Sequence, residues 1–381
     1  MRIHSTSLFL LLVQIFSCYA FVEYLSFSSS NLAGTSVEMT AFFAGGTNNS
    51  MCLSSMDSYS SSTAGSTPQP SSPLSLARLW LTATSANGLV LFAGGSTSNT
   101  TFTPSAKVDI FNATNNEWVQ GASLSEPRAL LTSTSVGELA FFAGGKNVIA
   151  SDVVDIFNAT SNSWSMTYFS ESRYLLASAS TSDSAFFAGG LARNLSYDAS
   201  QLVDIYNVEK ATWGIGALSV ARYALAGASS GSTVFFAGGL DEHDKASDVI
   251  DVYNNGWSTE SLSVARSYLA GVSAGKCVVF AGGIDASGDY STAVDIFHTT
   301  TQTWATLALS QGRASLAGAS VSIPNGHIAL FAGGSNKNGA SNVIDGFTCC
   351  DDGTIATERL VCKEVVTSTS GSTTGSADGM K

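Results

Sequence analysis

Hydrophobic and polar positions recur along the chain in a fixed order, which one segment shows clearly. Arg222–Ser229 is rich in small residues and predicts a strand that fits a crowded interior wall. After a turn at Gly231-Ser232, Thr233–Ala237 is continuously apolar, as expected for a strand covered on both faces. Asp248–Asn254 alternates like a third strand, and Trp257 opens a fourth. The segment predicts a four-stranded antiparallel meander.

This unit occurs seven times, and its clearest marker is a Gly-Gly pair after the apolar strand. A chain of strands with a period of about 50 residues is typical of the blades of a β-propeller. Two glycines fit there because the turn needs a positive φ or a close backbone approach. The pairs are Gly45-Gly46, Gly94-Gly95, Gly144-Gly145, Gly189-Gly190, Gly238-Gly239, Gly282-Gly283 and Gly333-Gly334.

Other landmarks keep a constant spacing within the unit. In four units an aromatic residue of the third strand precedes a Trp by seven positions: Phe111 and Trp118, Phe157 and Trp164, Tyr206 and Trp213, Phe297 and Trp304. An arginine stands just before the first strand at Arg78, Arg128, Arg173, Arg222, Arg266 and Arg313. The third strand carries an aspartate at Asp109, Asp155, Asp204, Asp251, Asp295 and Asp345.

Together these residues resemble the kelch repeat family over residues 25–348. The resemblance implies an all-β, kelch-type β-propeller of seven four-stranded blades, with six blades as the alternative. It says less about function, because kelch propellers include adaptors, actin-binding proteins, carbohydrate enzymes and ligand receptors. The first and last units lack the Trp, so the ends of the ring depart most from the pattern.

The ends of the chain divide it into three parts. Residues 1–20 have a weakly basic start, an apolar run and small residues before position 21, which predicts a secretory signal peptide and a secreted protein. The propeller is expected over 21–348, with Phe21–Tyr24 as the outer strand of the last blade and Ile355–Val366 as the competitor for that place. Residues 349–381 form a cysteine-containing closing segment and a Ser/Thr/Gly-rich tail. No membrane span is predicted.

Composition narrows the range of partners. The net charge is -12 and charged residues make up only 12% of the chain, so a basic surface for nucleic acid or anionic lipid is not expected. Five N-x-S/T sequons in predicted loops indicate glycosylation in a secreted protein: Asn48, Asn99, Asn112, Asn158 and Asn194.

The cysteines predict a crosslink at the ring closure. Five remain after removal of the signal peptide, and the odd number leaves one free. Cys277 opens an apolar strand and is predicted to be that buried free thiol. The others, Cys52, Cys349, Cys350 and Cys362, are disulfide candidates, with Cys52 to Cys349 or Cys350 favoured.

Catalytic and metal chemistry find little support in the sequence. Aspartates and arginines that recur in every unit are interpreted as structural, although a ring of arginines at one channel mouth could attract a carboxylate ligand. Two G-x-S-x-G matches, at Gly227–Gly231 and Gly271–Gly275, lie at equivalent turns with no helix after them, unlike a hydrolase nucleophile. His243, His298 and His327 belong to different units, so no metal site, cofactor or catalytic residue is predicted.

The leading hypothesis is an extracellular, non-enzymatic binding module for a protein or glycan. The alternative is a secreted sugar-modifying enzyme that resembles kelch-type sialic acid epimerases; an intracellular ubiquitin-ligase adaptor would need a helical domain before the propeller. Loops between the second and third strands differ in every unit and are expected to carry recognition. The candidate binding residues lie in the later units, within the sector of the fourth to sixth blades: Asp241, Glu242, His243, Asp244, Asp285, Asp289 and Tyr290.

Overall fold

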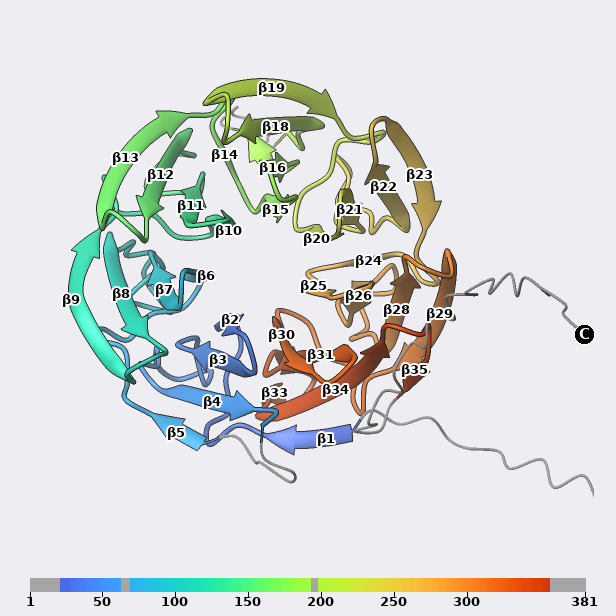
Figure 1. The fold of residues 1–381 in the computed structure, drawn as a ribbon, viewed down its shortest axis with the longest axis horizontal. Helices are drawn as coiled ribbons and strands as arrows, with labels where there is room; N and C mark the ends of the chain where they lie inside the picture. The colour runs from blue at the N-terminus through green and yellow to red at the C-terminus, as the bar shows by residue number, and fades with distance from the viewer. Residues whose placement is uncertain (1–20, 63–68, 193–197, 357–381) are drawn as a thin grey trace, which may run out of the picture.

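Every regular element in the described part of the chain is a β-strand, and the strands form a ring around a central channel (Figure 1). The computed structural model describes residues 21–62, 69–192 and 198–356. The predicted signal peptide and the Ser/Thr/Gly-rich tail lie outside this range. Within it, no helix is long and apolar enough to cross a membrane.

Seven antiparallel sheets make the blades, six with four strands and one with four strands and the short β35 (Ile355–Ala356), so the seven-bladed prediction is confirmed over the six-bladed alternative. Blade 1 consists of β2 (Ala33–Val37), β3 (Thr40–Ala44), β4 (Met56–Ser60) and β5 (Gln69–Ser71). Blade 2 consists of β6 (Thr82–Ala86), β7 (Leu89–Ala93), β8 (Lys107–Asn112) and β9 (Glu117–Ser123). Blade 3 consists of β10 (Thr132–Val136), β11 (Leu139–Ala143), β12 (Val153–Asn158) and β13 (Ser163–Tyr168). Blade 4 consists of β15 (Ala177–Ser180), β16 (Ser184–Ala188), β18 (Leu202–Asn207) and β19 (Thr212–Ala217). Blade 5 consists of β20 (Ala226–Ser230), β21 (Thr233–Ala237), β22 (Val249–Tyr253) and β23 (Trp257–Ser261). Blade 6 is β25 (Ala270–Ala274), β26 (Cys277–Ala281), β28 (Ala293–His298) and β29 (Thr303–Ala308). Blade 7 is β30 (Ala317–Ile323), β31 (Gly326–Ala332), β34 (Val343–Cys350) and β1 (Phe21–Tyr24).

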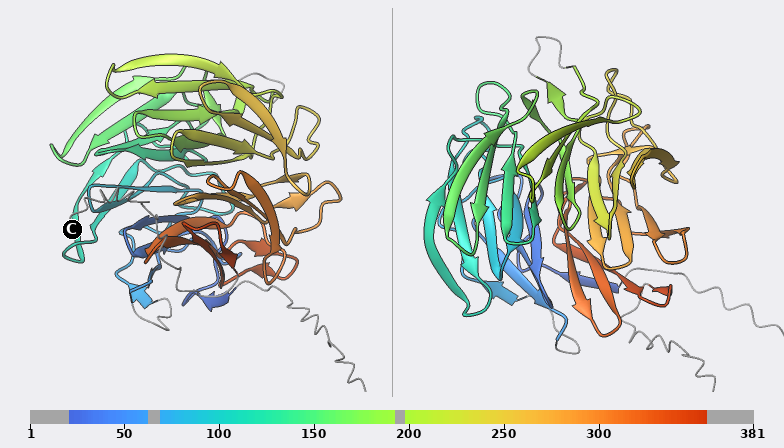
Figure 2. Two further views of the ribbon diagram at one scale, coloured as in Figure 1. Left: turned by 45° about the vertical axis from the view of Figure 1, so that its right-hand side comes forward. Right: turned by 45° about the horizontal axis from the view of Figure 1, so that its top comes forward.

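The core lies between neighbouring blades, because each sheet buries both faces. Phe235 of blade 5 and Phe280 of blade 6 belong to one buried cluster, for example. The recurring Trp pairs directly opposite the third-strand aromatic residue, which explains the constant spacing between them. In the pair Tyr206 and Trp213 the ring centroids are 5.0 Å apart. Figure 2 shows the stacked sheets and the loops that leave their two ends.

The Gly-Gly pairs meet the backbone requirement expected from the sequence. Gly189 and Gly190 have φ values of 64° and 103°, where side chains with a Cβ are strained. A Cβ on Gly189 would also lie 2.4 Å from the carbonyl oxygen of Arg222. The pair therefore lets the end of the second strand pack against the segment that enters the next blade.

The predicted closure of the ring is confirmed. β1 pairs with β34 in antiparallel register, from Phe21 opposite Gly346 to Tyr24 opposite Val343. Of the competing segment only Ile355–Ala356 lies within the described residues; it forms β35 and also pairs with β34, but further along, at Cys349 and Thr348. The two ends of the described chain thus share one sheet edge, and the N-terminal strand closes the blade (Figure 1).

Removing residues 21–24 should expose the paired edge of β34 and weaken the ring. Unpaired strand edges are templates for pairing with another chain. We expect a lower unfolding midpoint in urea and concentration-dependent dimers in light scattering. A monomer with unchanged stability would show that β1 does not close the ring.

Candidate binding face

Six of the seven blades share a buried ion pair between the recurring arginine and aspartate. In blade 4, Arg173 forms an ion pair with Asp204, and its Nη1 donates to the carbonyl oxygens of Gly189 and Leu202, each at 2.8 Å. The other aspartate oxygen accepts the backbone N–H of Ser170 at 3.1 Å. The ion pair therefore ties the segment entering the blade to its second and third strands. The equivalent pairs are Arg78–Asp109, Arg128–Asp155, Arg222–Asp251, Arg266–Asp295 and Arg313–Asp345.

The arginines are structural, as interpreted, but the suggested ring of guanidinium groups around the channel mouth is wrong. All six arginine side chains are fully buried. Burial lowers the pKa of Arg78 to about 10, while the negative charge of Asp109 acts in the opposite direction. The guanidinium stays charged at neutral pH, but it bonds to groups inside its own blade.

The first blade departs from this pattern. Ser29 stands where the other blades have arginine, and its Oγ donates to the carbonyl oxygen of Gly45 at 2.8 Å. The buried Asp57 accepts hydrogen bonds from the backbone N–H and the Oγ of Ser26, at 2.5 and 2.6 Å. Hydrogen bonds from serine thus replace the guanidinium at the blade next to the closure.

Two sets of loops emerge on one side of the ring, which we call the loop face. They are the loops after the Gly-Gly pairs and the segments that carry the arginines. In each blade a residue of one set pairs with a residue of the other, as Leu79 does with Ser96 and Tyr223 with Leu240. The predicted common face is therefore confirmed.

A closed ring of seven backbone hydrogen bonds surrounds the channel at the loop face. It passes through the residue two positions after each arginine, or after Ser29 in blade 1. Each residue donates its N–H to the carbonyl oxygen of its neighbour in the adjoining blade, at 2.9 to 3.3 Å. All seven have φ between 52° and 58°, although none is glycine. The ring residues are Asn31, Trp80, Leu130, Leu175, Ala224, Tyr268 and Ser315.

The side chains of these ring residues line a cavity of about 290 Å³, which we call the cup. Its floor is a collar of leucines, one from each blade, at the next position in the chain: Leu32, Leu81, Leu131, Leu176, Leu225, Leu269 and Leu316. A second chamber of about 290 Å³ lies beyond the collar and is lined mostly by small residues of the inner strands. Six of the collar leucines line both cavities, so the collar lies where the cup meets the second chamber.

Aromatic and charged side chains extend outward from the cup. The rings of Trp80 and Phe102 lie 6.1 Å apart, and Lys146 Nζ lies 4.9 Å from the ring centroid of Tyr174. The hydroxyl of Tyr223 donates to Asp244. Burial and this hydrogen bond both raise the pKa of Tyr223, so its hydroxyl stays protonated at neutral pH.

Apart from Asp244, which accepts the hydrogen bond of Tyr223, the predicted binding residues fall into three groups. Asp241 Oδ1 accepts the N–H groups of His243 and Lys245, at 2.8 and 3.0 Å, which lower the pKa of Asp241. Asp285 does the same for Ser287 and Asp289, at 2.8 and 3.1 Å. These two carboxylates fold their own loops. Glu242 and His243 are exposed, whereas Asp289 and Tyr290 line a groove between blades 6 and 7.

The sequons lie on both sides of the ring. Asn48 and Asn99 belong to loops of the loop face, and Asn48 is exposed. Asn112 and Asn158 are the last residues of β8 and β12 rather than loop residues, at the opposite face. Asn194 lies outside the described residues.

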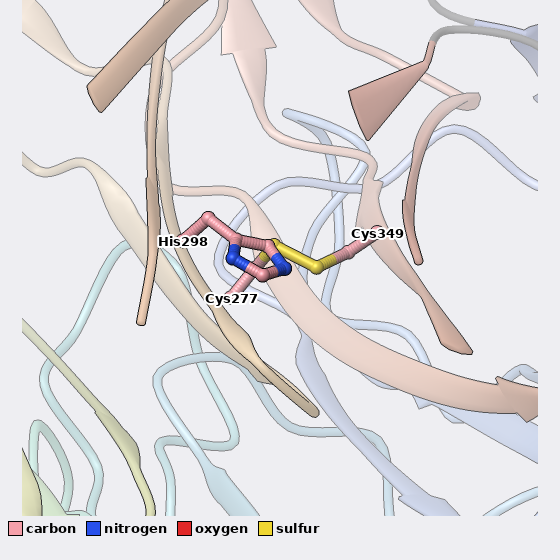
Figure 3. Close-up of side chains that lie close together, drawn as sticks. All are labelled: Cys277, His298 and Cys349. Carbon is pink, nitrogen blue, oxygen red and sulfur yellow. A yellow bond between two sulfur atoms is a disulfide. The ribbon is translucent and has the colours of Figure 1, made fainter. Parts of the chain in front are cut away.

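The disulfide prediction is wrong in its pairing. Cys277, expected to be free, is bonded to Cys349 and links β26 of blade 6 to β34 of blade 7 (Figure 3). Cys52, the expected partner of Cys349 or Cys350, lies in a loop of the loop face and is free. The two bonded cysteines lie at the opposite face of the ring, where β26 begins and β34 ends. Cys350 is also disulfide-bonded, and Cys362 lies outside the described residues.

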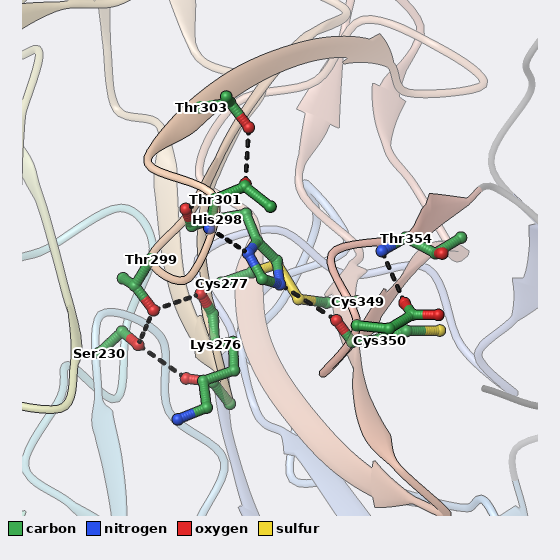
Figure 4. The surroundings of a disulfide bond; sticks show 12 residues. Ser230, Lys276, Cys277, His298, Thr299, Thr301, Thr303, Cys349, Cys350 and Thr354 are labelled. Carbon is green, nitrogen blue, oxygen red and sulfur yellow. Dashed lines mark hydrogen bonds between the residues drawn. A yellow bond between two sulfur atoms is a disulfide. The ribbon is translucent and has the colours of Figure 1, made fainter. Parts of the chain in front are cut away.

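His298 packs beside this disulfide, fully buried. Its Nδ1 accepts the N–H of Thr301 at 3.3 Å, and the side-chain oxygen of Asn158 accepts the N–H of Thr160 in a similar turn of blade 3. Because Nδ1 is an acceptor, Nε2 carries the proton and donates to the carbonyl oxygen of Cys350 at 3.1 Å (Figure 4). This is the one cluster of three candidate metal ligands among the described residues. Because both sulfur atoms are in the disulfide, the cluster is a crosslink beside a buried histidine. The two G-x-S-x-G matches do not lie in turns as expected, because their first four residues belong to β20 and β25 and only Gly231 and Gly275 reach the turn that follows. A strand, not a helix, follows each match.

Comparisons with known proteins agree with the architecture. No protein-family profile and no curated protein matches the sequence. A solved structure described as "Structure of YjhT" is similar, with a TM-score of 0.59 and 14% sequence identity, over 74% of this chain and 98% of that chain. At this identity the likeness shows the fold alone. The chain is therefore a seven-bladed β-propeller protein.

Proposed function

We propose that this protein is a secreted, kelch-type β-propeller that binds a protein or glycan partner at the cup and does not catalyse a reaction. One observation carries the proposal. The leucine of the collar is the same in all seven blades, whereas the ring position before it holds six different residue types. Varied side chains on a repeated, rigid scaffold are the usual arrangement of a recognition site.

Backbone strain supports a functional role for the ring. A non-glycine residue with positive φ costs on the order of 1–3 kcal/mol, and such residues cluster at ligand-binding sites. The closed hydrogen-bond ring keeps all seven in this conformation. The N–H and carbonyl groups of the ring residues are already hydrogen-bonded to one another, so a ligand in the cup would be recognised by side chains.

The chemistry of the cup favours binding over acid–base catalysis. Trp80, Tyr268, Asn31 and Ser315 come from neighbouring blades and make an aromatic and polar arc, opposite an aliphatic arc of Leu130, Leu175 and Ala224. None of the residues lining the cup carries a carboxylate, imidazole, thiol or amine, the groups that usually transfer protons. An amphipathic cup suits an apolar side chain of a protein or the apolar face of a sugar.

The proposed compartment rests on the sequence and one structural feature. The apolar run before residue 21 resembles a signal peptide, and the exposed Asn48 sequon is an accessible acceptor for a glycan. A buried disulfide is typical of proteins that mature in an oxidising compartment. Secretion and glycosylation of the expressed protein are checked by its recovery from medium and by glycosidase treatment.

Binding at the cup is tested with Trp80→Ala and Tyr268→Ala. Partners are sought on a glycan array and by proximity capture at the cell surface and in medium, with Ile215→Ala as an exposed apolar control on the outer strand β19. We expect each cup variant to lose about 10- to 30-fold in affinity and the control to keep it. Unchanged binding by both cup variants, or conversion of a sugar panel in mutarotation or hydrolysis assays, would contradict the proposal.

A further inference from the structure

A groove distinct from the cup lies on the loop face between blades 6 and 7. It has a volume of about 350 Å³. Blade 6 contributes Asp289 and Tyr290. The segment entering blade 7 contributes Gln311 and Gly312, and the hairpin of β32 (Ser335–Asn336) and β33 (Gly339–Ala340) contributes Asn336, Lys337 and Asn338. The groove is thus built from three segments of two blades.

Gly312 determines how closely the blade 6 loop approaches. A Cβ at this position would lie 2.0 Å from the carbonyl oxygen of Tyr290, an impossible contact. The residue just before the recurring arginine is alanine, proline or serine in the other five arginine-containing blades. The close approach of Tyr290 is therefore specific to this one position in the ring.

One wall of the groove is ordered before any ligand arrives. Asn336 Nδ2 donates to Gln311 Oε1 at 2.9 Å, and Gln311 Nε2 donates to Ser341 Oγ at 2.7 Å. The N–H of Asn338 is held by Asn336 Oδ1 at 2.8 Å. Groups fixed in this way lose little conformational entropy on binding.

We propose that this groove binds one uncharged sugar ring of a glycan, with Tyr290 as the stacking surface. A hydroxyl group both donates and accepts, and the groove offers an acceptor in Asp289, a donor in Lys337 and both in the amide of Asn338. One positive and one negative side chain do not favour a phosphate or sulfate, which would require clustered cations. A phenol ring supplies the apolar surface that the C–H face of a sugar needs. The inference goes beyond the proposed function, because it adds a second site for a single sugar ring and leaves the partner site at the cup.

The test is titration of methyl glycosides of glucose, galactose, mannose and N-acetylglucosamine into the intact protein, followed by saturation-transfer NMR and calorimetry. We expect at least one glycoside to bind with a Kd on the order of 1 mM. Tyr290→Ala and Asp289→Asn should each weaken it about tenfold or more. Gly312→Ala keeps every polar group of the groove but displaces Tyr290, and should have a similar effect.

Two controls separate this site from the cup and from misfolding. Tyr168→Ala removes an exposed tyrosine from the outer strand β13 and should leave binding unchanged, and all variants are compared by thermal melting. If sugar binding survives Tyr290→Ala and Gly312→Ala but is lost in Trp80→Ala, the groove inference is wrong and the cup remains the site. If no glycoside binds even at a concentration 50-fold above the expected Kd, the groove inference is also overturned. Capture of a protein partner whose binding depends on Trp80 would still leave the proposed function intact.

Discussion

Replacing Arg173 with Met should destabilise the propeller by about 3–5 kcal/mol. The substitution leaves Asp204 buried without its ion-pair partner and removes the donor to Gly189 and Leu202. An uncompensated buried charge costs more than the ion pair itself contributes. Urea unfolding monitored by tryptophan fluorescence should show a clearly lower midpoint, with a slope that reports whether the ring still unfolds as one unit.

The paired substitution Arg173→Met with Asp204→Leu separates the charge effect from lost packing. Removing both charges should recover part of the stability, because the remaining cost comes from Ser170 and the two carbonyl groups. Lys210→Met removes an exposed cation from the same blade and should change stability by less than about 0.5 kcal/mol. A double variant as unstable as Arg173→Met alone would show that the buried charge is not the cause.

Much of the fold could be predicted because each blade repeats the same local rules. The apolar run Thr233–Ala237 predicts β21 with its observed bounds, and the seven-residue spacing reports the direct cross-strand pairing of Tyr206 with Trp213. The closure was predictable for the same reason, since residues 25–36 align with the entry to a complete blade and leave Phe21–Tyr24 in the place of an outer strand.

The cup was missed because its residues carry no chemical signature. Asn31, Trp80 and Ser315 lie in what looks like the start of an inner strand, and their positive φ is imposed by hydrogen bonds between blades. The sequence does hold one usable signal, a variable position between a recurring arginine, replaced by serine only in the first blade, and a constant leucine. The prediction chose the acidic loops as the binding site instead, but Asp241 and Asp285 accept hydrogen bonds from the backbone of their own loops.

The predicted cysteine pairing was wrong because it considered only which blades the cysteines belong to, and not at which face of the ring each one lies. The third strand of each blade carries the chain from the loop face to the opposite face, so Cys349 ends β34 far from the loop of Cys52. The second strand begins at that opposite face, which places Cys277 beside Cys349 at a Cα–Cα distance of 6.2 Å. Strand direction within the blade would have indicated this pair.

Replacing Cys277 and Cys349 together with Ala should destabilise the protein by about 2–5 kcal/mol. The disulfide joins residues 72 positions apart and links blade 6 to blade 7, next to the closure made by β1. Its loss increases the conformational entropy of the unfolded chain and removes two fully packed sulfur atoms from the core. Guanidinium unfolding without reductant measures the effect, since Cys350 is also disulfide-bonded and reductant would act on that bond as well.

Cys52→Ala is the matched control, because the thiol of Cys52 is free and only half-buried at the loop face. Its loss should cost less than about 1 kcal/mol. Non-reducing peptide mapping of the wild-type protein should join the peptides of Cys277 and Cys349 and find Cys52 alkylated. A map that joins Cys52 to Cys349, or a Cys277→Ala/Cys349→Ala variant that unfolds at the wild-type midpoint, would contradict the role of this crosslink. A sharp loss of stability only in that double variant would identify the link between blades 6 and 7 as a main stabilising element of the ring.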